Sequence, residues 1–179
     1  MKKKKTWLGI VIACLVVFVV CVVPPLFLFE SISIQGSSME PTLGDCDVVL
    51  LDKFFGRFRK LKRYDVIVFY PNEKMKISGE RYYTKRIIGL PGETVQIQYG
   101  TVYINGRPLV EPVRYPLMEM AGQASEPIVL GDDEYFVLGD NRNESKDSRF
   151  LEVGPVKEEY IEGRLLFRIS PVKKLGIIK

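Results

Sequence analysis

Residues 81–92 read Arg81-Tyr82-Tyr83-Thr84-Lys85-Arg86-Ile87-Ile88-Gly89-Leu90-Pro91-Gly92. The aromatic and β-branched side chains of the first part are typical of a strand, and the Gly-Leu-Pro-Gly that follows is a turn signal. Comparable runs on both sides of it predict a mainly β protein with no long helix after residue 30. The other expected strands are Glu30–Gln35, Asp47–Leu51, Asp65–Tyr70, Thr94–Tyr99, Thr101–Ile104, Glu134–Leu138 and Arg164–Ile169.

Shorter signals lie between these runs. Asn105-Gly106 predicts a type I′ hairpin turn. Val156–Ile161 is expected to make a single helical turn, whereas Leu117–Glu126 shows no clear period and is expected to be a mobile loop.

The N-terminal segment predicts a membrane anchor. Trp7–Phe29 is apolar and carries no charge, and a helix of roughly 20 residues spans a bilayer. It is too long for the apolar part of a cleaved signal peptide, and Val22-Val23-Pro24-Pro25 is not a small-x-small cleavage site. The lysines Lys2–Lys5 precede it, which orients the N-terminus to the cytoplasm. The expected domains are therefore a cytoplasmic segment at 1–6, a retained transmembrane helix at 7–29 and an extracytoplasmic domain at 30–179.

Composition restricts the chemistry. The chain has 26 basic and 22 acidic residues, and the four N-terminal lysines equal the excess, so no basic field for nucleic acid is expected. There is no histidine, which excludes Ser-His-Asp and Cys-His catalysis and removes the commonest zinc ligand. Cys14, Cys21 and Cys46 form no readable disulfide framework. Acid-base chemistry must come from Lys, Asp, Glu or Tyr.

The segment from Lys53 to Arg63 is basic and aromatic. It holds six cations, three phenylalanines and no acid. Two interpretations stay open: a solvated turn whose aromatic side chains join the core, or a loop that rests on an anionic lipid surface.

A serine and a lysine are the candidate reacting groups. Ser38 lies in Gln35-Gly36-Ser37-Ser38-Met39-Glu40-Pro41-Thr42-Leu43, a few residues after the anchor, and such a stretch alone is more typical of a turn. Lys85 alone is most simply a lysine that points to water. Without histidine, however, lysine is the obvious base for a serine nucleophile. Burial beside Met39 and Tyr83 could lower its pKa from ~10.4 by up to roughly 3–5 units, while Arg86 would face the other side of the strand.

A polar loop follows the strand that ends near Leu138. It reads Gly139-Asp140-Asn141-Arg142-Asn143-Glu144-Ser145-Lys146-Asp147-Ser148-Arg149. Asp147 and Arg149 are expected to form an ion pair, Asp140 to bond loop amides, and Ser145 to orient Lys85. The loop would hold the geometry of the site.

Four stretches, in order along the chain, resemble the motif set of bacterial type I signal peptidases, also called leader peptidases. They are Gly36–Leu43, Arg63–Phe69, Tyr83–Glu93 and Gly139–Arg149. The short chain and single anchor resemble the Gram-positive branch. The resemblance implies a Ser/Lys dyad protease in which Ser38 is the nucleophile and Lys85 the base. It further implies that Ser145 orients the lysine and that Asp147 and Arg149 support the site.

The resemblance also implies a fold and a substrate. The fold is an extracytoplasmic domain of coiled antiparallel sheets, with a second β lobe inserted at about 94–130. The substrates are secreted preproteins, cut after small residues in an Ala-x-Ala-like pattern near the bilayer and the secretion translocon. The oxyanion would bind the Ser38 amide, and no metal or organic cofactor is called for. The expected substrate-binding residues are Ile34, Gln35, Gly36, Met39, Tyr82, Tyr83 and Thr84.

Some positions depart from the family pattern. Gly36 stands where some members carry a serine that helps to hold the oxyanion, a contribution worth ~2.7–4 kcal/mol. Tyr64 replaces a common glycine, Glu93 an aspartate and Lys146 a small residue. Lys146 is expected to compete for Asp147.

Two other classes stay open. A self-cleaving Ser/Lys protein would use the same dyad but carry its own scissile bond, usually beside a DNA-binding domain, and no such domain fits here. A non-enzymatic membrane-anchored β module would keep Ser38 in a turn and Lys85 in solvent.

Overall fold

The computed structural model describes residues 7, 11–19, 29–53, 60–71 and 82–178. Residues 11–19 are helical, and within the described ranges no helix is both long and apolar enough to span a membrane. Much of the predicted anchor (8–10 and 20–28) and of the basic aromatic loop (54–59) lies outside the described residues. The membrane anchor and the two interpretations of the basic aromatic loop therefore stay predictions.

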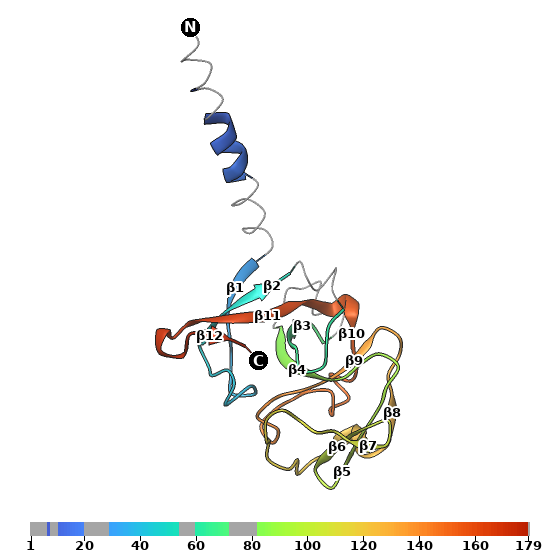
Figure 1. Ribbon diagram of the computed structural model, residues 1–179. Coiled ribbons are helices and arrows are strands. Elements are labelled where there is room, and N and C mark those ends of the chain that lie inside the picture. Colours follow the sequence, from blue (N-terminus) through green and yellow to red (C-terminus); the bar gives the residue numbers. More distant parts are fainter. Residues whose placement is uncertain (1–6, 8–10, 20–28, 54–59, 72–81, 179) are drawn as a thin grey trace.

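Most strands belong to one antiparallel sheet. Its order is β1-β2-β11-β3-β4-β9-β10, and β12 pairs with β11 (Figure 1). The long strand β11 bridges the two halves, because it pairs with β2 on one side and β3 on the other. The strands are β1 (Phe29–Ser33), β2 (Val48–Asp52), β3 (Val66–Phe69), β4 (Tyr83–Gly89), β9 (Glu134–Leu138), β10 (Val156–Lys157), β11 (Ile161–Ser170) and β12 (Gly176–Ile177).

A second, four-stranded sheet has the order β7-β6-β5-β8. Its strands occur in the chain between β4 and β9, which are neighbours in the main sheet. Figure 1 shows it at the lower end of the molecule, beyond β9 and β4. The strands are β5 (Thr94–Gln98), β6 (Thr101–Ile104), β7 (Arg107–Pro108) and β8 (Ile128–Val129).

The observed strands confirm the mainly β prediction, with small shifts at their ends. Asn105 and Gly106 both have positive φ angles, 51° and 75°, as a type I′ turn requires. The expected helical turn is the 3-10 turn η2 (Glu158–Tyr160). Two further 3-10 turns are η1 (Gly122–Ser125) and η3 (Val172–Lys174).

The central strand β3 is buried on both faces. Val66 and Val68 pack into one hydrophobic cluster with Met39 and Leu43, whereas Ile67 and Phe69 pack into another. The neighbouring strand β4 is buried over six of its seven residues. Lys85 therefore lies on a buried strand of the sheet.

Candidate active site

The turn that carries Ser38 is held by packing and by hydrogen bonds to side chains. Gly36 has a φ of +81°, and its N–H donates to the Asp45 carboxylate at 2.7 Å. On the other side of Ser38, Met39 and Leu43 are 1% and 0% exposed in the core. The Ser38 side chain is half-buried and the Ser37 side chain is exposed. The turn thus presents Ser38 from an anchored backbone.

Lys85 reaches Ser38 from β4. The side chain is buried, and Nζ donates to Ser38 Oγ at 2.7 Å and to the Thr84 carbonyl at 3.0 Å. Nζ also lies 5.7 Å from the centroid of the Tyr83 ring. The structure therefore brings the two predicted reacting groups into hydrogen-bond contact.

The protonation of Lys85 is shifted toward the neutral amine. Burial lowers the pKa of Lys85 to about 8, although the negative charges of Asp147 and Asp140 act in the opposite direction. With that pKa, roughly one chain in ten holds a neutral Lys85 at pH 7. A neutral amine beside a serine hydroxyl can accept its proton.

The loop at 139–149 is hydrogen-bonded to the turn that carries Ser38. The backbone N–H of Asn141 donates to the Ser38 carbonyl at 3.1 Å, and its Nδ2 donates to the Ser37 carbonyl at 3.2 Å. The loop can lie this close to the Ser38 turn only with glycine at position 139. A Cβ there would lie 2.5 Å from the Ser38 carbonyl oxygen and would overlap the Ser145 hydroxyl. That hydroxyl is buried and has no hydrogen-bond partner in the part of the chain that the structure describes. The expected bond from Ser145 to Lys85 is thus not formed in this state.

Asp147 and Arg149 form the expected ion pair. Both are buried, and the guanidinium donates to the two carboxylate oxygens at 2.8 and 2.9 Å. The Asp147 carboxylate also accepts the Gly139 amide at 3.1 Å. Lys146 does not compete for Asp147, because its ammonium pairs with the exposed Glu152 at 3.6 Å. The loop is therefore closed by a buried charge pair.

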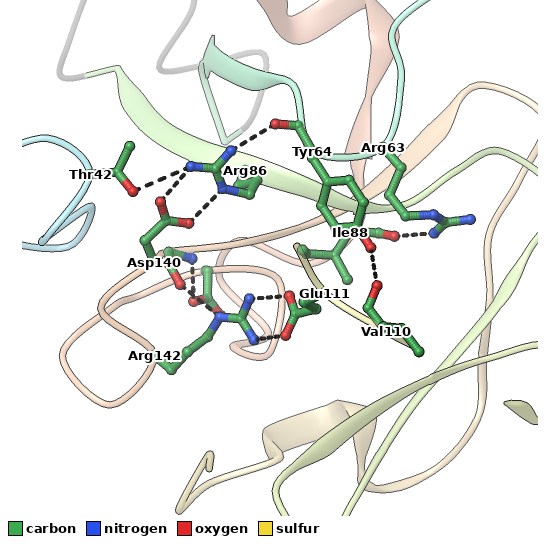
Figure 2. Close-up of polar contacts among 11 residues, drawn as sticks. Thr42, Arg63, Tyr64, Arg86, Ile88, Val110, Glu111, Asp140 and Arg142 are labelled. Carbon is green, nitrogen blue, oxygen red and sulfur yellow. Dashed lines mark hydrogen bonds and ion pairs between the residues drawn. The ribbon is translucent and has the colours of Figure 1, made fainter. Parts of the chain in front are cut away.

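Asp140 has a different partner from the one expected. Its carboxylate accepts two bonds from Arg86, at 2.7 and 2.6 Å, and not from loop amides. Figure 2 shows this pair between Thr42 and Tyr64, both of which accept from the same guanidinium. The partners of Arg86 are thus separate from Ser38 and Thr84, the hydrogen-bond partners of Lys85. The pair of Arg86 and Asp140 ties the loop to β4 one residue after the candidate base.

A further pair was not predicted. Arg142 is 2% exposed and makes a bidentate ion pair with Glu111 (Figure 2). Its guanidinium also lies 4.0 Å from the centroid of the Tyr115 ring. Nearby, Asn143 donates to the Leu117 carbonyl and Arg149 to the Met120 carbonyl. The segment expected as a mobile loop is thus bound to the candidate active-site loop. No periodicity in the sequence signals these long-range contacts.

Ser38 and Lys85 open onto a cleft of about 320 Å³. All of the residues expected to bind substrate line it, and Lys146 completes the wall. The lining residues are Ile34, Gln35, Gly36, Ser38, Met39, Tyr82, Tyr83, Thr84, Lys85 and Lys146. The fold and site thus define a class of protein: a β scaffold in which a serine hydroxyl and a buried lysine amine meet at the wall of an open cleft.

Comparisons with known proteins show the family of this chain. Residues 5–170 match the family described as signal peptidase, peptidase S26. A probable signal peptidase I-2 of Synechocystis is 36% identical over 98% of this chain and 78% of its own. A signal peptidase I of Leptolyngbya laminosa is 41% identical over 84% of this chain and 73% of its own. A signal peptidase I structure from Enterococcus faecalis aligns at 34% identity with a TM-score of 0.47, over 60% of this chain and 97% of that one. The chain belongs to the signal peptidase family, peptidase S26.

Proposed function

We propose that this chain is a membrane-bound serine endopeptidase that removes N-terminal signal peptides from secreted preproteins. The observation that carries the proposal is the 2.7 Å contact between Ser38 Oγ and the buried amine of Lys85. Family membership supports the same activity, since the relatives it matches are named signal peptidases.

The reaction follows from the two groups. Lys85, once neutral, accepts the Ser38 proton as Oγ attacks the scissile carbonyl carbon. The carbon–nitrogen bond then breaks, and the Lys85 ammonium gives its proton to the leaving amine. Water attacks the acyl-enzyme, Lys85 takes one of its protons, and that proton returns to Ser38. Asp147, Arg149 and Asp140 hold this geometry through their ion pairs, and Ser145 packs against Gly139 behind Ser38.

The oxyanion is held by the Ser38 backbone amide. Gly36 offers no hydroxyl, and its amide already donates to Asp45. A second donor, worth ~2.7–4 kcal/mol where one is present, must then come from another group or from water.

Substrate binds in extended form. Strand β1 is an edge strand of the main sheet, so one side of its backbone is open to a peptide that adds as a further strand. Ile34, Met39 and Tyr83 line the cleft at its end. We expect the small side chains of an Ala-x-Ala-like sequence to bind against them.

The membrane arrangement belongs to the same proposal. Residues 7–29 form the anchor, the N-terminus is cytoplasmic, and residues 30–179 lie outside. The uncharged Trp7–Phe29 run and the lysines Lys2–Lys5 support it. The site would then lie close to the bilayer and the translocon, where the cleavage point of a preprotein emerges.

The test is cleavage of a purified preprotein by the full chain in neutral detergent, with N-terminal sequencing of the product. We expect one cut, directly after a small residue at the end of the signal peptide. A well-folded chain that cuts nothing would favour the binding-module alternative. A chain that cuts only itself would favour the self-cleaving alternative.

A further inference from the structure

We propose that Lys146 gives the cleft a charge preference, so that the enzyme favours substrates with an acidic side chain near the scissile bond and disfavours basic ones there. This rests on the proposed function. Lys146 lines the same cleft as Ser38 and Lys85. The proposed chemistry gives it no role.

The backbone at Lys146 is held on both sides. Ser145 is 7% exposed and Asp147 is 0% exposed. Arg149 anchors both neighbours, since its guanidinium donates to the Ser145 carbonyl at 3.2 Å and pairs with the Asp147 carboxylate. The loop therefore presents Lys146 at a fixed point of the cleft wall.

The side chain of Lys146, in contrast, is free to exchange partners. It is 50% exposed, and its ion pair with Glu152, itself 67% exposed, is 3.6 Å long. Exposed pairs of this kind are weak. A substrate carboxylate in the cleft can replace Glu152 at little cost.

No opposite charge in the cleft wall cancels Lys146. Among the described residues that line the cleft, Lys85 and Lys146 are the only charged side chains, and none is acidic. Lys85 must be neutral to act as a base, so Lys146 then supplies the charge of the wall. An acidic side chain is attracted and a basic one is repelled. For an exposed pair the expected discrimination is about 2- to 5-fold.

The experiment uses the full chain in neutral detergent and a set of peptides that span an Ala-x-Ala site. Glu, Gln or Lys is placed at one flanking position at a time, and kcat/KM is measured. The variants are Lys146→Met, which keeps the length of the side chain, and Lys146→Glu. Lys157→Met is the matched control, since Lys157 is exposed on β10 and does not line the cleft.

We expect the wild type and Lys157→Met to prefer Glu over Lys at one or more positions by about 2- to 5-fold. Lys146→Met should lose the preference and Lys146→Glu should invert it, each judged as the ratio of kcat/KM for the Glu and Lys peptides within the same variant. High salt should weaken the preference. Glu152→Gln, which frees Lys146, should strengthen it and provides the test if a Lys146 variant fails to fold.

A wild type without charge preference at any position would overturn the inference. So would a preference that persists unchanged in Lys146→Met and Lys146→Glu. Either result with normal cleavage of the Gln peptide leaves the proposed function intact. Failure of the wild type to cut the Gln peptide would instead count against the proposed function itself.

Discussion

Ser38→Ala and Lys85→Met should each lower kcat for preprotein cleavage by about 10³-fold or more, whereas Ser37→Ala should stay close to wild type. Ser38 Oγ and Lys85 Nζ are in contact at 2.7 Å. The proposed reaction needs both groups, because Ser38 is the nucleophile and Lys85 is the base that takes its proton. Ser37 is exposed on the adjacent position of the turn. The measurement is steady-state cleavage of one preprotein at saturating concentration by the wild type and the three variants.

The thermal stability of Lys85→Met shows whether a loss of activity in this variant comes from misfolding. Burial lowers the pKa of Lys85 to about 8, so the folded chain releases this proton at a lower pH than the unfolded chain does. The buried ammonium therefore costs stability below about pH 8, and the cost fades as the pH rises toward ~10.4. Met fills the space without that cost, so the variant should melt no lower than wild type at pH 7. Wild-type activity in a folded Ser38→Ala or Lys85→Met protein would refute the dyad.

Asp147→Asn is expected to cost about 3–5 kcal/mol in the free energy of unfolding, because it leaves the buried Arg149 guanidinium without its counter-charge. The same carboxylate holds the Gly139 amide, so the turn behind Ser38 also loosens. Denaturant unfolding of the full chain measures the loss. Glu152→Gln, which breaks an exposed pair, is the matched control and should cost less than about 1 kcal/mol.

Asp147→Asn should also move the pH dependence of any residual activity. Burial lowers the pKa of Lys85, and the Asp147 charge partly offsets that effect. Removing the charge lowers the pKa of Lys85 further, so the rise of the rate with pH should shift to lower pH. A shift to higher pH, or a stability loss no larger than that of Glu152→Gln, would contradict this role for Asp147.

Local patterns in the sequence predicted most of the fold. Strands such as β9 and β6 coincide with their apolar runs, and Asn105-Gly106 forms its turn. The absence of histidine pointed to Lys85 as the candidate base, and resemblance selected Ser38 over Ser37. These inferences need only neighbouring residues, composition or a motif.

The pairs that join distant segments could not be predicted. Arg86 meets Asp140 across 54 positions, and Arg142 meets Glu111 across 31 positions. In the unfolded chain, each of these arginines could meet several acidic residues. Only the folded sheets determine which acidic residue becomes its partner. Lys146 was expected to compete with Arg149 for Asp147, but Asp147 is buried and pairs with Arg149, while Lys146 pairs with the exposed Glu152.

The central claim is that a neutral Lys85 activates Ser38. The most direct test is the rate at which an acylating probe labels the full chain at different pH values, with the adduct located by mass spectrometry. We predict a single adduct on Ser38, a rate that rises with pH to a plateau above about pH 8, and slow labelling of Lys85→Met. An adduct elsewhere, a rate that does not change across this range, or equally fast labelling of Lys85→Met would contradict it.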